Sequence, residues 1–167
     1  PGEAILAAVG IAFLAGIFGW LFSGPAGALI VFALVVLLVF GFISWAGNRE
    51  KRKFEEQLPD TLVLLATSLR AGYSLLQAVE AVAAEAPNPT AREFGRAIAE
   101  ARLGRSVTEA MQGITDRTQS KDFEWAVMAI EIQREVGGTL AEVLQTVADP
   151  MLARNRLRGE IRALTAE

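Results

Sequence analysis

The chain has 167 residues, no cysteine and no histidine, and a formal net charge of −3. Without cysteine, a disulfide framework and a thiolate metal site are excluded. Without histidine, a Ser-His-Asp triad and imidazole ligation are excluded. The sequence also lacks the G-x-x-x-x-G-K-[ST] pattern of a P-loop. Acidic and basic residues number 19 and 16, a balance that argues against binding to nucleic-acid phosphates.

The first part of the chain is apolar. Residues 4–47 contain no charged side chain, and every Lys, every Arg and every acid except Glu3 lies beyond them. A helix needs about 20 apolar residues to cross a bilayer, so this stretch has room for two spans. Residues 1–47 therefore predict a transmembrane helical hairpin, with spans over about 4–22 and 28–45 and a Gly-Pro break between them. Trp20 and Trp45 fall near the span ends, where aromatic rings favour the interface.

Residues 48–58 are expected to form a basic juxtamembrane connector. The positive-inside rule places basic residues that closely follow a span in the cytoplasm, together with the polar part of the chain. A specific site for anionic lipid or for a partner is the sharper alternative. A secretory signal peptide fits poorly, because it has a single short apolar region. The basic residues after the second span are Arg49, Lys51, Arg52 and Lys53.

A short glycine-containing motif recurs about every 33 residues in the polar part of the chain, a length that suits one helical hairpin per repeat. Each glycine is expected to end a helix, because glycine adopts the left-handed C′ conformation without steric penalty. The Ser or Thr that follows, with Gln or Glu three positions later, predicts a capping box. The turn and capping residues are Gly72, Ser74, Gln77, Gly104, Ser106, Glu109, Gly137, Gly138, Thr139 and Glu142.

Apolar periodicity and these turns predict helices over 59–71, 75–86, 89–103, 107–116, 121–136 and 140–149. Pro59 is expected in the first turn of the first helix, and Asn88 is expected to cap the third helix. Short connections make neighbouring helices antiparallel. Residues 59–149 therefore predict an all-α cytoplasmic bundle of six helices, built from three helical hairpins.

The helix over 121–136 is apolar on a second side. This side carries Trp125, Met128, Ile132 and Val136 in addition to the expected core face. Two interpretations remain open: the helix is central in the bundle, or its second side is a subunit contact.

Residues 150–167 are predicted to form a basic amphipathic helix after a kink or break at Pro150. Arg154, Arg158 and Arg162 recur on one face, and apolar residues occupy another. This pattern suits a membrane-proximal helix. The segment is either a solvated helix end or the approach to a further membrane span that the chain given does not include.

Several segments carry a combined pattern. They read FEEQLPD from Phe54, LRAGYSL from Leu69, EF at Glu93, LGRS from Leu103 and IEIQREVGGTL from Ile130. Together they resemble the type II secretion system F domain family, and within it the platform proteins of tight-adherence pili. The resemblance covers about residues 49–167, and the two preceding spans also fit it.

The resemblance implies an inner-membrane, multi-pass protein whose helical domain faces the cytoplasm. It implies no enzymatic activity and no cofactor. The implied partners are a cytoplasmic secretion ATPase, pilin subunits, a sister platform protein and membrane lipids, in a homo- or hetero-oligomer. Exposed charged residues are the candidate ATPase contacts, with a solvated surface as the alternative for each: Arg70, Arg92, Arg96 and Glu135.

Two other functions compete with a platform. The first is a membrane-anchored interaction or signalling module that has no motor partner. The second is an enzyme that uses carboxylates such as Glu131 and Glu135, which stand one helical turn apart. Acid pairs at this spacing are common on solvated helix faces, and the sequence supplies no further metal ligands beside them.

Overall fold

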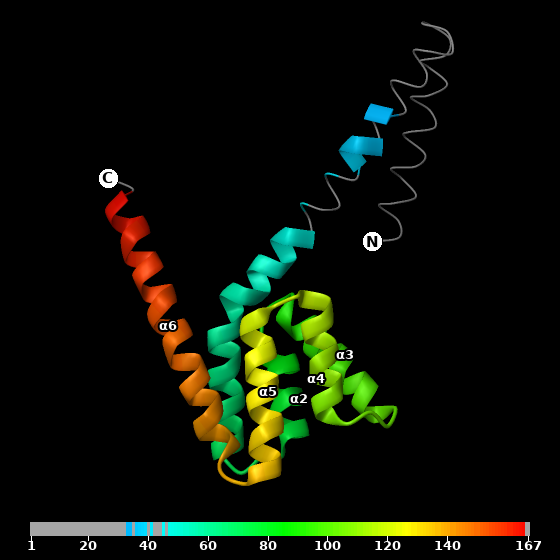
Figure 1. Cartoon of the computed structure of the whole chain (residues 1–167), viewed down its shortest axis with the longest axis vertical. Coiled ribbons are helices and arrows are strands. Elements are labelled where there is room, and N and C mark those ends of the chain that lie inside the picture. The colour runs from blue at the N-terminus through cyan, green and yellow to red at the C-terminus, as the bar shows by residue number, and fades with distance from the viewer. Residues whose placement is uncertain (1–32, 35, 40, 42–44, 46, 166–167) are drawn as a thin grey trace, which may run out of the picture. The chain divides into compact units, whose positions relative to one another are not determined.

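The computed structural model describes residues 33–34, 36–39, 41, 45 and 47–165 (Figure 1). The chain divides into two compact units, Pro1–Arg49 and Glu50–Glu167. The predicted span over 4–22 lies outside the described residues, and so does most of the predicted span over 28–45. Within the part that is described, no helix has the length and hydropathy that a bilayer crossing requires.

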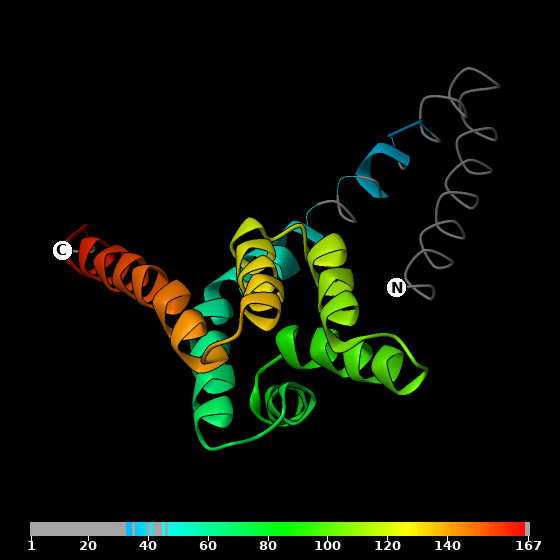
Figure 2. The ribbon, with the colours of Figure 1, turned by 60° about the horizontal axis from the view of Figure 1, so that its bottom comes forward.

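In the described part of the second unit, helices joined by short turns are the only regular elements, which agrees with the predicted all-α class. The first helix of this unit covers residues 50–70. The helices that follow are α2 (Leu75–Glu85), α3 (Thr90–Arg102), α4 (Val107–Thr118), α5 (Lys121–Val136) and α6 (Leu140–Thr165). From α2 onward, each helix packs against the next one along the chain. The C-terminal part of α6 projects away from the other helices of this unit, as both views show (Figures 1 and 2).

A core of apolar side chains from every helix holds the unit together. At its centre, the Phe123 ring of α5 meets the Phe54 ring edge-on, with 5.6 Å between centroids. The Phe94 ring of α3 lies 5.7 Å from Phe123 on another side. The largest fully buried side chains are Phe54, Phe94, Phe123, Leu58, Leu62, Leu65, Met111, Ile114, Ile130, Leu144, Val79 and Val82.

The first helix begins well before Pro59, so the prediction that it starts there is wrong. Residues 47–58 are helical, and Pro59 lies in the interior of a helix that ends at Arg70. Phe54 and Leu58 are each 1% exposed. Burying two such side chains contributes about 1.5–3 kcal/mol each, which outweighs the cost of about 3 kcal/mol for an interior proline. The apolar stripe therefore carries the helix through Pro59.

The sequence predicted that Asn88 caps helix α3, and this prediction is wrong. A side chain that is distant in the sequence caps the helix instead. Its N-cap is Pro89, which offers no side-chain bond. Instead Gln57 Oε1 accepts a hydrogen bond from the Thr90 hydroxyl at 2.6 Å and a longer one from the Thr90 N–H at 3.4 Å. Gln57 Nε2 donates to the Asn88 carbonyl at 3.0 Å. The helix over 50–70 thus supplies the cap that α3 lacks.

Helix α6 runs through Pro150 without the break that the sequence suggested. Pro150 is exposed, so water can reach the Thr146 carbonyl that the missing N–H leaves unpaired. Burial on both sides of the proline favours one continuous helix. The buried side chains of α6 are Ala141, Leu144, Ala148 and Met151.

The second apolar side of α5 faces outward. Trp125 is 65% exposed and Val136 is 79% exposed, while Phe123, Val127 and Ile130 on the opposite side are buried. The interpretation of α5 as the central helix of the bundle is therefore wrong, because its second apolar side is not covered by other helices. A subunit contact on this side stays a prediction.

Candidate functional site

The turns at Gly72 and Gly104 close the preceding helices in the same way. Gly72 has φ +90° and Gly104 has φ +102°, a region that favours glycine. At the first turn the Tyr73 N–H donates to the Ser68 carbonyl at 3.1 Å, and the Gly72 N–H donates to the Leu69 carbonyl at 3.0 Å. This pair of bonds defines a Schellman motif. The equivalent pair is present at Gly104.

Helices α2 and α4 each begin with a complete capping box, in which both reciprocal hydrogen bonds are present. The Ser74 hydroxyl accepts from the Gln77 N–H at 3.3 Å, and Gln77 Oε1 accepts from the Ser74 N–H at 2.8 Å. Ser106 and Glu109 form the same pair at 3.1 and 3.0 Å. The pKa of the Glu109 carboxyl is lowered mainly by the hydrogen bond from the Ser106 N–H and to a smaller extent by the Ser106 hydroxyl, because both stabilise the charged form.

The third turn differs from this pattern. Gly137 and Gly138 have φ +84° and +130°, and Gln133 Nε2 donates to the Gly137 carbonyl at 3.0 Å. No capping box joins Thr139 and Glu142, although both residues are described. The Glu142 N–H donates to the Thr139 carbonyl at 3.2 Å instead. That backbone bond uses the donor that the expected side-chain cap required.

Glu93 is the centre of an ion-pair network on α3. Its side chain is 7% exposed. Arg117 Nε of α4 donates to Glu93 Oε2 at 2.8 Å. Arg92 Nε and Arg96 Nη1 lie 3.4 and 3.6 Å from Glu93 Oε1. A buried carboxylate requires such partners, because its charge otherwise loses hydration without compensation.

The network extends to the start of the helix over 50–70. Arg92 and Glu50 form a two-bond pair, with Nη2–Oε2 at 2.7 Å and Nη1–Oε1 at 3.3 Å. The Arg92 hydrogen bond lowers the pKa of the Glu50 carboxyl, and the same bond raises the pKa of Arg92. These residues are 42 positions apart, so the pair ties α3 to the first helix of the unit.

On its other side the network reaches the end of α3. Arg117 Nη1 donates to Glu100 Oε1 at 3.2 Å, and Glu100 also pairs with Arg105. Arg117 Nη2 is buried and makes no hydrogen bond. Gly113 leaves room for this guanidinium, since a Cβ there would lie 3.1 Å from Arg117 Nη1. This network was not predicted from the sequence; the i, i+3 spacing of Glu93 and Arg96 is the one local signal that could have indicated part of it.

The four candidate ATPase contacts lie at three separate positions on the surface. Arg92 and Arg96 lie together at Glu93, with side chains 43% and 57% exposed. Arg70 is exposed at the last residue of the first helix. Glu135 is exposed in the last turn of α5. The structure therefore brings two of the four together.

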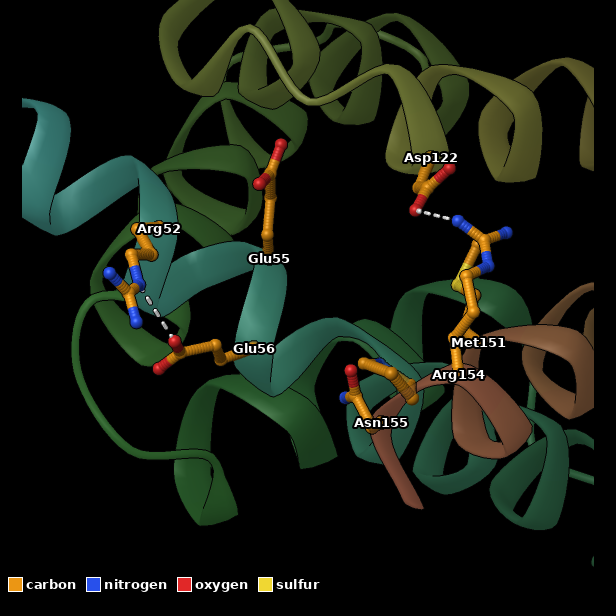
Figure 3. Close-up of a pocket in the computed structure, with 8 residues that line it drawn as sticks. Arg52, Glu55, Glu56, Asp122, Met151, Arg154 and Asn155 are labelled. Atoms are coloured by element: carbon orange, nitrogen blue, oxygen red, sulfur yellow. Dashed lines mark hydrogen bonds and ion pairs between the residues drawn. The ribbon is translucent and has the colours of Figure 1, made fainter. Parts of the chain in front are cut away.

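Two of the predicted membrane-proximal basic residues line one cleft (Figure 3). The cleft has a volume of about 440 Å³ and lies between the first helix, α5 and α6. Arg52 pairs with Glu56 at 3.0 Å, and Arg154 pairs with Asp122 at 3.8 Å. These pairs neutralise most of the charge in the cleft.

The other basic residues of this group are distributed along the chain. In the first unit the Arg49 guanidinium lies 5.5 Å from the centre of the Trp45 ring. Lys51 and Lys53 belong to the first helix of the second unit. Arg158 and Arg162 lie in α6, and their side chains are outside the described part. Among described residues no acidic cluster could hold a metal ion.

The fold and the network define a helical protein whose charged groups tie helices to one another. The family described as "Type II secretion system (T2SS), protein F" matches residues 61–167. This match covers more than half of the chain, which therefore belongs to that family. Family members are structural platform proteins of type II secretion and type IV pilus machines. No curated protein and no solved structure matches the chain.

Proposed function

We propose that the chain is an inner-membrane platform protein of a tight-adherence pilus that couples a cytoplasmic secretion ATPase to pilin assembly. The family match over 61–167 carries the proposal. In this proposal residues 1–47 form a transmembrane helical hairpin, the helices of the second unit form an antiparallel bundle of helical hairpins in the cytoplasm, and residues 150–167 lead toward the membrane.

The ties between helices support a force-transmitting role. Glu50 with Arg92 and Gln57 with Thr90 fasten the first helix to α3. Arg117 then fastens α3 to α4 through Glu93. Such ties resist relative movement of the helices, so a push on one helix moves the others with it. A helical unit of this kind suits an adaptor whose partner supplies the energy.

The ATPase contact is assigned to exposed charges that the network leaves available. Arg70 and Glu135 are exposed, and neither has a side-chain partner in the described part of the chain. Arg92 and Arg96 are less favoured as ATPase contacts, because they already form ion pairs with Glu50 and Glu93. Pilins, a sister platform protein and lipids are the further proposed partners, in an oligomer.

A deletion strain tests this function in cells. Loss of the gene is expected to abolish surface pili while pilin stays in the inner membrane, and the wild-type gene is expected to restore them. Arg70→Glu is expected to impair restoration, whereas Thr67→Glu, an exposed substitution one turn earlier, serves as the control. Normal piliation without the gene contradicts the proposal and favours the alternative, a membrane-anchored interaction or signalling module.

A further inference from the structure

The outer side of α5 combines an apolar stripe with a row of acids. The stripe consists of Trp125, Met128, Ile132 and Val136, which are 65%, 45%, 53% and 79% exposed. Their spacing of three or four residues places them on one side of the helix, opposite the buried core side. Large apolar side chains gathered on one surface indicate an interaction site when they form a contiguous patch.

A glutamate row borders this stripe along one flank. The row consists of Glu124, Glu131 and Glu135, all of them exposed. At 100° per residue, the three stand side by side along the helix. None of them has a hydrogen-bond or ion-pair partner from a side chain in the described part of the protein. The row therefore presents negative charge that the fold itself does not neutralise.

The charges around the stripe disfavour a second copy of this helix as the occupant. In an antiparallel pair of α5 helices, equivalent flanks face each other, so the two glutamate rows would repel. In a parallel pair, each row would face the flank that carries Asp122 and Gln133, where α5 supplies no cation and Arg154 of α6 is already paired with Asp122. Lys121, at the N-terminal end of the stripe, is one cation against three acids.

We propose that the outer side of α5 binds an amphipathic helix of a different protein, with Lys or Arg along one flank of its apolar face. Such a helix places apolar residues on the stripe at positions i, i+3 or i+4, and i+7. Its basic flank meets the glutamate row. The stripe extends over about 17 Å at 1.5 Å per residue, so three turns of the partner cover it. This binding does not depend on the chain being a pilus platform.

A charge-swap experiment tests the proposal. The full chain is placed in phosphatidylcholine nanodiscs and titrated against two labelled 18-residue helical peptides. Both peptides have the same leucine face, and their flanks carry either lysine or glutamate. We expect the lysine peptide to bind about tenfold more tightly, the effect of three exposed charge pairs of modest strength. Glu124→Lys/Glu131→Lys/Glu135→Lys is expected to reverse this preference.

The matched control changes the same total charge elsewhere. Glu55→Lys/Glu85→Lys/Glu160→Lys replaces three exposed acids on other helices, the first helix, α2 and α6, and is expected to keep the lysine preference. Peptide binding to lipid is the same for all variants, so it does not produce a reversal. If the triple variant on α5 fails to fold, Glu131→Lys alone is expected to lower the preference from about tenfold to about twofold, one third of the full reversal in free energy.

Three results would overturn the proposal. The first is equal affinity of the wild-type chain for both peptides. The second is a lysine preference that survives the three substitutions on α5. The third concerns the position of binding. Since the chain has no cysteine, Ile132→Cys can be cross-linked to a cysteine in the peptide, with Thr67→Cys as control. Cross-linking of Ile132→Cys to a second copy, without the peptide product, identifies a self-association surface instead.

Discussion

Arg117 provides the sharpest test of the network, because two carboxylates depend on it. Arg117→Met removes the guanidinium while a side chain of similar length remains. Glu93, whose side chain is 7% exposed, then loses its partner at 2.8 Å and keeps only Arg92 and Arg96, at 3.4 and 3.6 Å. Breaking a buried ion pair costs about 3–5 kcal/mol. We expect the lower end, about 3 kcal/mol, because two arginines still face Glu93.

Amide hydrogen exchange in the full chain measures this loss where it occurs. A loss of about 3 kcal/mol corresponds to exchange more than a hundredfold faster at protected amides of α3 and α4. Glu93→Gln removes the charge that Arg117 satisfies, so adding Glu93→Gln to Arg117→Met is expected to recover at least about 1 kcal/mol. Exchange less than about fivefold faster in Arg117→Met would refute the network as a source of stability.

Three further perturbations follow from the same contacts. Gln57→Ala is expected to destabilise the start of α3 by about 1–2 kcal/mol, seen as faster exchange at α3 amides, and Gln77→Ala is a control at another helix start. Gly113→Ala is expected to lower the melting temperature, because its methyl group crowds Arg117; Gly95→Ala has open space and is expected to raise it. The pKa of Glu50 is lowered in the fold, so its contribution is full above the ordinary glutamate pKa and is lost in acid as pH falls through the folded pKa. Arg92→Gln is expected to remove that acid-dependent part of an unfolding titration, and an unchanged pH profile would contradict it.

Local sequence signals predicted the parts of the fold that local chemistry determines. Glycine with a following capping residue located the turns at Gly72 and Gly104, because these motifs close their bonds within a few residues. The same reasoning was wrong at Pro59 and Pro150. There, burial against distant helices outweighs the local preference of proline.

The candidate site was harder to predict, since its members are far apart in the chain. Glu50 and Arg92, or Gln57 and Thr90, meet only after the first helix packs against α3. Apolar spacing indicated the second side of α5, but no local signal tells a covered face from an exposed one. The acids beside this face indicate a binding surface only because Trp125 is exposed, and the sequence alone does not show that exposure.

The platform role is tested most directly by the mass of a purified complex. The full-length protein, in mild detergent, is combined with a secretion ATPase from the same organism, and the mass of the complex is measured by native mass spectrometry. The proposed function predicts one stable complex of defined stoichiometry, weakened by Arg70→Glu and retained by Thr67→Glu. A folded, helical protein that stays separate from the ATPase under all conditions would contradict the proposed coupling.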